Sequence, residues 1–418
     1  MGSTRAIRCL AIAVVIGLAL TSHSTQRTRA AELRVFILDS AQLKATRDKL
    51  RSGDQTLAPA LEQLKRDADA ALDAGPFSVV NKDVLPPSGN KHDYLSLAPY
   101  WWPDPKSPTG LPYIRRDGER NPEIYKIRNR LDLGEFADAV DALALAWYFT
   151  GDKRYADRAA LLVRTWFHDP ATRMNPNLRF GQGIPGINTG RGVGLIETRM
   201  FSRVVDSVGL IESSASWTEA DRRGMQQWFA AFLNWMLESE NGREEAAAKN
   251  NHGTYYDVQI ASFALFLDKR DLAAKVLREA GQKRIAVQVA PDGRQPLELA
   301  RTKAWSYSVG NLAGLMTLAR LAEHVDVDLW NFKSEGGASI RAALDFLAPF
   351  ATQERTWTYQ QINGFDADLL HPLLYKAAAK YPDANYRELI SRLPKRSAAS
   401  RANLLLSPLD PISQLHKR

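Results

Sequence analysis

Helical segments that are apolar on more than one face constrain the fold of this chain most. Residues 133–149 (LGEFADAVDALALAWYF) are alanine-rich and strongly apolar, and Gly151-Asp152 ends the segment. Residues 218–239 begin with Thr218-Glu219-Ala220-Asp221, which has the form of a capping box, and carry large aromatic residues after it. A helix that is apolar on several faces must pack between other helices. We therefore predict an all-α protein built from layers of helices.

Helical spacing of apolar residues predicts more helices along the chain. The expected segments are 41–74, 154–167, 255–267, 271–288, 301–324, 338–349 and 366–380. Successive helices joined by short turns favour antiparallel hairpins. We expect these hairpins to form a curved stack or ring.

The first thirty residues have the features of a signal peptide. Arg5 and Arg8 form a basic start, and residues 9–20 (CLAIAVVIGLAL) form an apolar core that is too short to span a bilayer comfortably. Thr28 and Ala30 are small residues at the spacing of a cleavage site, so we predict cleavage after Ala30. An earlier cleavage site and a membrane anchor are the alternatives. A periplasmic or secreted mature protein is expected.

Removal of residues 1–30 changes the charge and the cysteine content. The chain has a net charge of +8, and the segment holds four arginines and no acidic residue, so the mature protein carries +4 (8 − 4). Its basicity is thus partly that of the signal, which weakens a nucleic-acid interpretation. Cys9 is the only cysteine, so no disulfide is expected. We expect one domain over 31–390, a C-terminal tail over 391–418, and a monomer that binds neither nucleic acid nor membrane.

Two groups of residues could carry chemistry. The cluster Asn250-Asn251-His252, followed by Tyr255-Tyr256, offers amide donors, a base of near-neutral pKa and phenols. A turn at Asp292-Gly293 leads into a predicted helix that carries Arg301 and Tyr307, six residues apart and so on roughly adjacent faces. Arg301 can hold a carboxylate with two hydrogen bonds, and Tyr307 can transfer a proton if a nearby cation lowers its pKa.

These roles match β-elimination on a uronic acid polymer. The C5 proton of a uronate becomes acidic only when the neighbouring carboxylate is neutralised, which Arg301 and Asn251 could do. His252 or Tyr307 would take that proton, and Tyr307 would protonate the glycosidic oxygen at C4. No metal and no other cofactor is needed. Taken singly, His252 could be an ordinary hydrogen-bonded polar residue, Arg301 a surface charge and Tyr307 a half-buried aromatic residue.

The two motifs, together with a third, resemble those of the alginate lyase superfamily. The third runs from His92-Asp93-Tyr94 through Tyr100-Trp101-Trp102-Pro103 to Gly110-Leu111-Pro112-Tyr113, and the similarity extends from about residue 35 to 380. The resemblance implies an (α/α) toroid, an incomplete barrel of antiparallel helical hairpins with long loops over a cleft for an acidic polysaccharide. It also implies that Asn251, His252, Arg301 and Tyr307 line the catalytic subsite.

One departure bears on the substrate. In the best-known branch of the superfamily the aromatic pair after the histidine ends in tryptophan, and the arginine stands one residue further from the tyrosine. Tyr255-Tyr256 and the spacing of six are closer to a sister branch that cleaves glucuronan as well as alginate. The uronate polymer, and endo or exo cleavage, therefore stay open.

Long loops over residues 76–124 and 168–192 supply the remaining candidates, because loops of this length are usually lids or binding segments. The expected substrate-binding residues are Asn250, Tyr100, Trp101, Trp102, Gln182, Asn188, Arg191 and Tyr256. Trp101 and Trp102 could stack on sugar rings or pin their loop to the helices. Glu197 and Arg199 could form an internal ion pair.

Two other classes of function remain as alternatives. A glycoside hydrolase on a similar helical toroid requires two carboxylates that flank the scissile bond. Asp93, Asp104 and Glu197 could serve, but none is paired in a motif. A non-catalytic polysaccharide-binding protein would bind polymer without releasing the unsaturated uronate that a lyase produces.

Overall fold

Helices make up most of the regular structure. The computed structural model describes residues 2, 33–394 and 396–406, and the residues from Leu33 onward belong to one unit. Apart from residue 2, the predicted signal peptide lies outside the described residues.

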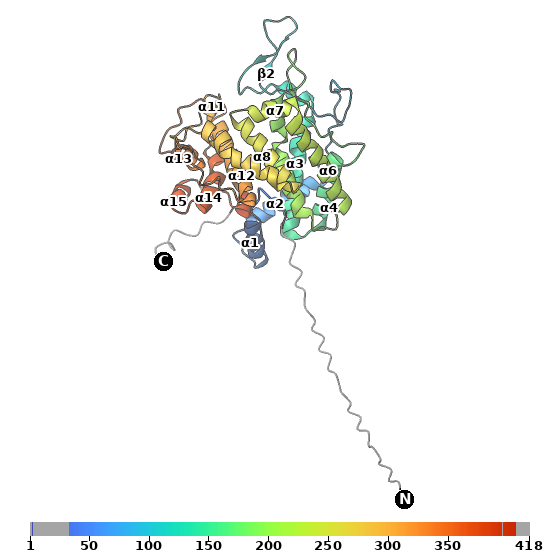
Figure 1. Cartoon of the computed structure of the whole chain (residues 1–418), viewed down its shortest axis with the longest axis vertical. Helices are drawn as coiled ribbons and strands as arrows, with labels where there is room; N and C mark the ends of the chain where they lie inside the picture. Colours follow the sequence, from blue (N-terminus) through green and yellow to red (C-terminus); the bar gives the residue numbers. More distant parts are fainter. Residues whose placement is uncertain (1, 3–32, 395, 407–418) are drawn as a thin grey trace. The chain divides into compact units, whose positions relative to one another are not determined.

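Four helices form an inner layer that follows the order of the chain: α3 (Asn129–Thr150), α5 (Phe201–Ile211), α8 (Asn251–Phe266) and α12 (Ala304–Ala322). Each packs against the next, α3 on α5, α5 on α8 and α8 on α12. Nearly every residue of α5 and α8 is buried, because each helix packs against several others. Figure 1 shows α8 and α12 side by side at the centre of this unit.

An outer layer covers these helices. It contains α2 (Ala58–Asp73), α4 (Lys153–Phe167), α6 (Glu219–Glu238), α9 (Arg270–Ala280) and α13 (Ile340–Ala351). The helices α2 and α4 pack on α3, α6 and α9 on α8, and α13 on α12. Since α3 and α4 pack together and are separated by only two residues, they form an antiparallel hairpin. The predicted layers of helical hairpins are confirmed.

Turn residues set the ends of these helices. Gly151 ends α3 with a φ of 76°, in the left-handed region that glycine tolerates. The Asp152 side chain then accepts a hydrogen bond from the Arg154 amide and begins α4. The predicted capping box of α6 is present, because the side chains of Thr218 and Asp221 each accept a hydrogen bond from the other residue's backbone amide.

Some helix boundaries differ from the prediction. The segment 41–74 is two helices, α1 (Ser40–Arg51) and α2, because the chain turns at Gly53, whose φ is 85°. The helix expected over 255–267 begins earlier, at Asn251, and the one expected over 301–324 begins later, at Ala304. The chain also forms α5 and a short helix, α7 (Glu240–Ala247), outside the predicted segments.

Shorter helices connect these layers and follow them. They are η1 (Pro122–Lys126), η2 (Gly192–Met200), the π-helix η3 (Gly281–Ile285), α10 (Ala286–Gln288), α11 (Pro296–Leu299), η4 (Glu323–Val325), η5 (Ala367–Leu370), α14 (His371–Lys380), α15 (Tyr386–Arg392) and α16 (Ala402–Leu405). The described part of the predicted tail includes α16, which packs on α1 and α2. Arg401 joins it to Asp67 and Asp141 by ion pairs of 2.9 and 3.1 Å.

Four short strands tie the two long loops together. They are β1 (Leu95–Leu97), β2 (Trp101–Trp102), β3 (Ile114–Arg115) and β4 (Phe180–Gly183). β1 pairs in parallel with β4, which connects the loop 76–124 to the loop 168–192, and β2 pairs with β3 in an antiparallel hairpin. Figure 1 shows β2 at the edge of the unit beyond α7.

We find no described helix with the length and apolarity needed to cross a membrane.

Candidate active site

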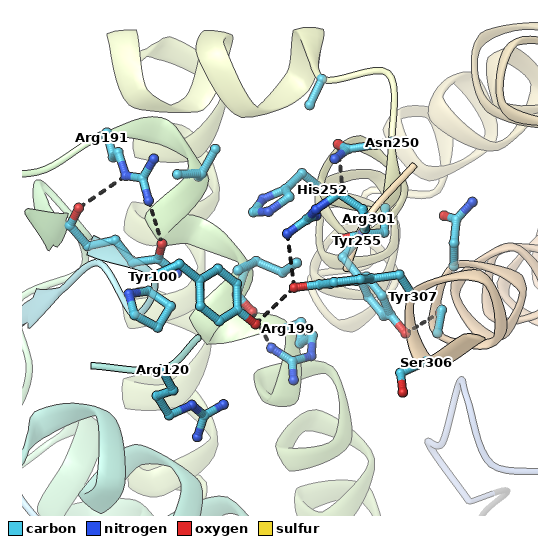
Figure 2. A pocket seen from close by; sticks show the side chains of 18 of the residues that line it. Tyr100, Arg120, Arg191, Arg199, Asn250, His252, Tyr255, Arg301, Ser306 and Tyr307 are labelled. Carbon is cyan, nitrogen blue, oxygen red and sulfur yellow. Dashed lines mark hydrogen bonds between the residues drawn. The ribbon is translucent and has the colours of Figure 1, made fainter. Parts of the chain in front are cut away.

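A cavity of about 460 Å³ lies where the long loops meet the first turns of α8 and α12. The loop 76–124 contributes Tyr100, Trp101 and two arginines to its wall, and α8 contributes Asn251, His252 and Tyr255. Arg301, Ser306 and Tyr307 come from the start of α12 and the residues before it. Figure 2 shows these side chains around one space. All four predicted catalytic residues therefore line a single cavity.

The wall of this cavity is strongly cationic. Six arginines line it: Arg115, Arg120, Arg130, Arg191, Arg199 and Arg301. Among the residues that the structure describes, no aspartate or glutamate is part of the wall. Several positive charges around one cavity attract a polyanion and repel cations. The cavity is thus suited to a ligand that carries repeated negative charge.

The start of α8 explains the run of two amides before His252. Asn250 is the N-cap residue, and its side chain accepts a hydrogen bond from the His252 amide at 3.3 Å. Asn251 follows as the first helical residue, and Tyr255 lies one turn further on the same face. Tyr255 lines the cavity and donates to the Gly310 carbonyl at 2.9 Å.

Tyr256 corrects one expected contact. It is 5% exposed, and its hydroxyl donates to the Met236 carbonyl at 3.0 Å, inside the core. In the helix α8, position 256 is rotated by about 100° from position 255, and Tyr256 faces away from the cavity. Tyr255, not Tyr256, is the tyrosine of the pair that a ligand in this cavity can reach.

Buried carboxylates hold two of the predicted residues from behind. Nδ1 of His252 lies 2.8 Å from Oε1 of Glu245, which comes from α7 and is 1% exposed. Glu298 of α11, also 1% exposed, accepts from the backbone amide of Asn251 at 2.7 Å and from its side-chain amide at 2.8 Å. Burial raises the pKa of both carboxyl groups.

Arg301 differs from its predicted setting in two ways. It precedes α12 instead of lying on it. Its guanidinium also already holds a carboxylate, that of Asp117, with N–O distances of 2.8–3.1 Å. Burial favours protonation of Asp117, but the hydrogen bonds from Arg301 and Thr302 outweigh it and hold the Asp117 pKa well below its ordinary value. This ion pair joins the loop 76–124 to the start of α12.

Tyr307 lies between Arg301 and Tyr100. Its hydroxyl accepts from Nη2 of Arg301 at 3.0 Å and donates to the Tyr100 hydroxyl at 2.8 Å, as the dashed lines in Figure 2 show. The sequence suggested that a cation lowers the Tyr307 pKa. The structure shows a raised pKa instead, because burial and the hydrogen bond to Tyr100 outweigh the charge of Arg301. Tyr307 therefore keeps its proton and is suited to donate it.

The remaining predicted binding residues divide into two groups. Asn250, Tyr100, Trp101, Gln182 and Arg191 line the cavity. Arg191 donates to both the backbone carbonyl and the side-chain oxygen of Gln182, at 3.2 and 3.1 Å, and so holds the glycine-rich loop.

Two of the predicted binding residues lie outside the wall of the cavity. The indole of Trp102 donates to the Glu119 carbonyl at 3.0 Å, and its ring lies beside the Arg116 guanidinium. Asn188 accepts from the Ile184 amide at 3.2 Å and closes a turn of its own loop. Both residues stabilise the loops instead of facing a ligand.

Sequence reasoning missed Arg115, Arg120, Arg130 and Arg199 as cavity residues. The ion pair expected between Glu197 and Arg199 is absent from the described contacts of Glu197, which pairs with Arg130 at 3.1 Å and accepts hydrogen bonds from Tyr94 and Ser96. Arg199 is thereby left at the cavity, with its guanidinium 5.9 Å from the centre of the Tyr255 ring. No local motif marks these arginines.

The described residues contain no group of three or more His, Cys, Asp or Glu side chains placed to hold a metal ion.

The model of the alginate lyase family matches residues 78–357. The chain belongs to the alginate lyase family. The match spans the cavity wall from Pro99 to Asn311, and it identifies the protein as a polysaccharide lyase. Among the curated proteins, none matches the chain.

Solved structures of alginate lyases have the same fold. An alginate lyase from Bacteroides ovatus is 41% identical, with a TM-score of 0.87, over 89% of this chain and 99% of that one. Alginate lyase A1-III from Sphingomonas species A1 is 15% identical, with a TM-score of 0.54, over 91% and 98%. A histidine-to-alanine variant of A1-III, complexed with tetrasaccharide, has a TM-score of 0.57 at 15% identity, over 93% and 100%. The predicted α/α toroid is confirmed.

Proposed function

We propose that this polysaccharide lyase cleaves a 4-linked uronic acid polymer by β-elimination, with alginate as the first candidate substrate and glucuronan as the second. The observation that carries the proposal is the composition of the cavity wall. Six arginines, amides, one histidine and tyrosines line it, and the described wall contains no carboxylate. A glycoside hydrolase of the usual type needs two carboxylates beside the scissile bond. The family membership and this wall both support elimination over hydrolysis.

The substrate carboxylate would lie among the cations and amides of the wall. Arg301 and Asn251 line the cavity beside His252, so they can stabilise the negative charge that develops when the C5 proton leaves. Arg301 already shares its charge with Asp117. The neighbouring arginines of the wall therefore carry part of the neutralisation.

The hydrogen bonds of His252 and Tyr307 support the following proton transfers. Nε2 of His252 takes the C5 proton, and the electron pair of the C5–H bond forms the C4–C5 double bond. The C4–O bond breaks, and the leaving oxygen takes the proton of Tyr307, which the raised pKa keeps on the hydroxyl until that step. Exchange with solvent then returns both residues to their starting state. The products are a new reducing end and an unsaturated uronate at the new non-reducing end.

The test is a substrate screen with purified protein. Alginate, polymannuronate and glucuronan are supplied separately, and the ultraviolet absorbance of the new C4–C5 double bond is followed together with the number of reducing ends. We expect both to rise in equal amounts on at least one polymer. Reducing ends that appear without the absorbance would mean hydrolysis and would overturn the proposal.

Replacement of the predicted acid gives a sharper test. Tyr307→Phe removes the proton donor while keeping the ring, so kcat should fall by about 10²–10⁴-fold, the usual range for loss of a general acid. Tyr155→Phe is the matched control, since the Tyr155 hydroxyl donates to Asp69 outside the cavity. Both variants are compared by initial rates of absorbance change. Equal rates in Tyr307→Phe and wild type would remove Tyr307 from the chemistry.

A further inference from the structure

Glu245 is the only carboxylate within hydrogen-bonding distance of His252 among the described residues, and it is almost completely buried. Its Oε1 lies 2.8 Å from Nδ1 of His252, and its side chain is 1% exposed, whereas that of His252 is 19% exposed. The second oxygen, Oε2, is buried and has no hydrogen-bond partner within the described part of the chain. A buried polar side chain normally keeps at least one hydrogen-bond partner. The His252 ring therefore provides the hydrogen bond on which Glu245 depends.

Rigid packing holds the two residues at this distance. Glu245 lies near the end of α7 and His252 in the first turn of α8, so the corner between these helices sets their geometry. Arg284 of the π-helix η3 is 1% exposed and fastens that corner. It donates to the carbonyls of Ala246 and Ala248 at 2.9 and 2.7 Å and forms an ion pair with Asp257 of α8 at 2.6 Å.

Gly253 allows Arg284 to approach so closely. A Cβ atom at this position would lie 2.1 Å from the Ala248 carbonyl oxygen and 2.2 Å from Nη1 of Arg284. Any residue other than glycine at position 253 would therefore displace the corner between α7 and α8. The contact between Glu245 and His252 is thus a fixed feature of the fold.

The position of the proton follows from this contact. When Glu245 is ionised it only accepts hydrogen bonds, so Nδ1 of His252 then carries the hydrogen that Glu245 accepts. In the neutral ring the other nitrogen, Nε2, then has no hydrogen and can act as a base. When Nε2 takes a proton, the imidazolium that forms is paired with the buried carboxylate.

Charges of both signs face this pair. Arg191 lies at the start of η2 and favours the ionised form of Glu245, whereas Glu244 of α7 opposes it. Glu298 of α11 also faces His252, and Arg301 lies near Glu298 and partly offsets its charge. The two arginines line the cavity, so the side of the pair that faces the cavity is the cationic one.

We propose that Glu245 is a positioning residue that fixes the Nδ1-protonated tautomer of His252 and thereby makes Nε2 the base of the elimination. The tautomer rests on the contact with ionised Glu245, and the role of Nε2 rests on the proposed function. Glu245 does not line the cavity and touches no substrate. Its contribution is made through His252.

The first measurement is the nitrogen spectrum of the histidine rings. The full chain is labelled with ¹⁵N-histidine, the His252 signals are assigned by their loss in His252→Gln, and the protonated nitrogen is read from the chemical shifts. We expect the hydrogen of wild-type His252 on Nδ1 and a mixture of tautomers in Glu245→Gln. A hydrogen on Nε2 of the neutral wild-type ring would overturn the proposal, whatever the protein cleaves.

The second measurement is kinetic. Glu245→Gln should lower kcat by about 10²-fold, the lower range for loss of a correctly protonated base, and leave KM nearly unchanged because substrate contacts are kept. Glu245→Asp keeps the carboxylate and should recover part of the rate. Glu240→Gln is the matched control, because it removes one charge from the exposed start of α7 and should act like wild type. Circular dichroism confirms that each variant is folded.

The outcomes separate the two proposals. If wild type forms no unsaturated product, the proposed function fails while the tautomer measurement still stands. Suppose instead that wild type forms product. If Glu245→Gln then keeps a wild-type kcat, or if Glu245→Asp is no more active than Glu245→Gln, the proposed role of Glu245 is wrong. The proposed function would still stand in either case.

Discussion

At the scale of residues, the arrangement around Tyr307 separates the tasks of acid and base. Tyr307 donates to Tyr100 and is buried, which raises its pKa, whereas His252 has a carboxylate behind it. A phenol with a raised pKa is a poor base at neutral pH and a dependable proton donor. The structure thus supports different roles for two residues that the sequence left interchangeable.

The different roles of Tyr307 and His252 predict how kcat/KM depends on pH in the alkaline range. The ordinary pKa of tyrosine is 10.0, and that of Tyr307 is raised above it, so the fraction of protonated Tyr307 stays near one up to pH 10. Since a donor must be protonated, kcat/KM should show no loss from Tyr307 below pH 10. Initial rates from pH 6 to pH 10.5, with circular dichroism at each pH, check this. A kcat/KM that rises tenfold per pH unit towards pH 10 would identify Tyr307 as the base instead.

At the scale of elements, the corner between α7 and α8 depends on the π-helix η3. Local π-helical turns are rare and often occur at functional sites. Here η3 directs Arg284 inward to two carbonyls of the corner and to Asp257. The helix that carries His252 is therefore positioned by a segment about thirty residues further along the chain.

Loss of the contacts that Arg284 makes with the corner and with Asp257 should destabilise the fold. Arg284→Met leaves the buried carboxylate of Asp257 with only Lys283 nearby, at 3.7 Å, and should cost about 3–5 kcal/mol of unfolding free energy. The free energy is measured by urea unfolding, with exposed Arg278→Met as the control. A double variant, Arg284→Met with Asp257→Leu, should lose less than the sum of the single variants. Strictly additive losses would show that the two charges do not depend on each other.

At the scale of the whole molecule, the outer helices hold the inner helices in place, and the loops add the charge. Most cavity arginines come from the loops and η2, not from the helical layers. Exposed charges attract a polyanion over distances that salt shortens to about 8 Å at physiological ionic strength. The electrostatic contribution belongs to the assembled cavity and not to any one residue.

Salt should therefore weaken binding more than it weakens catalysis. KM for a long polyuronate should rise several-fold between low and high salt, while kcat changes little, because the reacting groups are partly buried and screened less. The comparison uses initial rates over a series of sodium chloride concentrations. A short oligouronate is the control, since it reaches fewer arginines and should show a weaker dependence. An identical dependence for both substrates would argue against a binding role for the outer arginines.

Much of the molecule was predictable because the relevant patterns are local. Apolar residues at helical spacing predicted the layers of helices, and the residues of the Asn250–His252 cluster and the Arg301–Tyr307 segment do line one cavity. The boundary at Asn251 was missed because helical spacing alone did not identify Asn250 as an N-cap. Tyr256, instead of Tyr255, was predicted to bind substrate, because the order of the two tyrosines in the sequence does not show which one faces the cavity.

What the sequence by itself determined is which elements form and which side chains carry chemistry, because helix periodicity and residue type act over one or two turns of chain. Only the tertiary structure decided the partners of those side chains. Asp117 meets Arg301 across 184 positions, Glu298 meets Asn251 across 47, and Tyr100 meets Tyr307 across 207. No local sequence pattern predicts these pairs, because the packing of loops brings together residues that are far apart in the sequence. These contacts hold Arg301 and Asn251 in place and raise the Tyr307 pKa, so the fold determines how the residues of the predicted site can act.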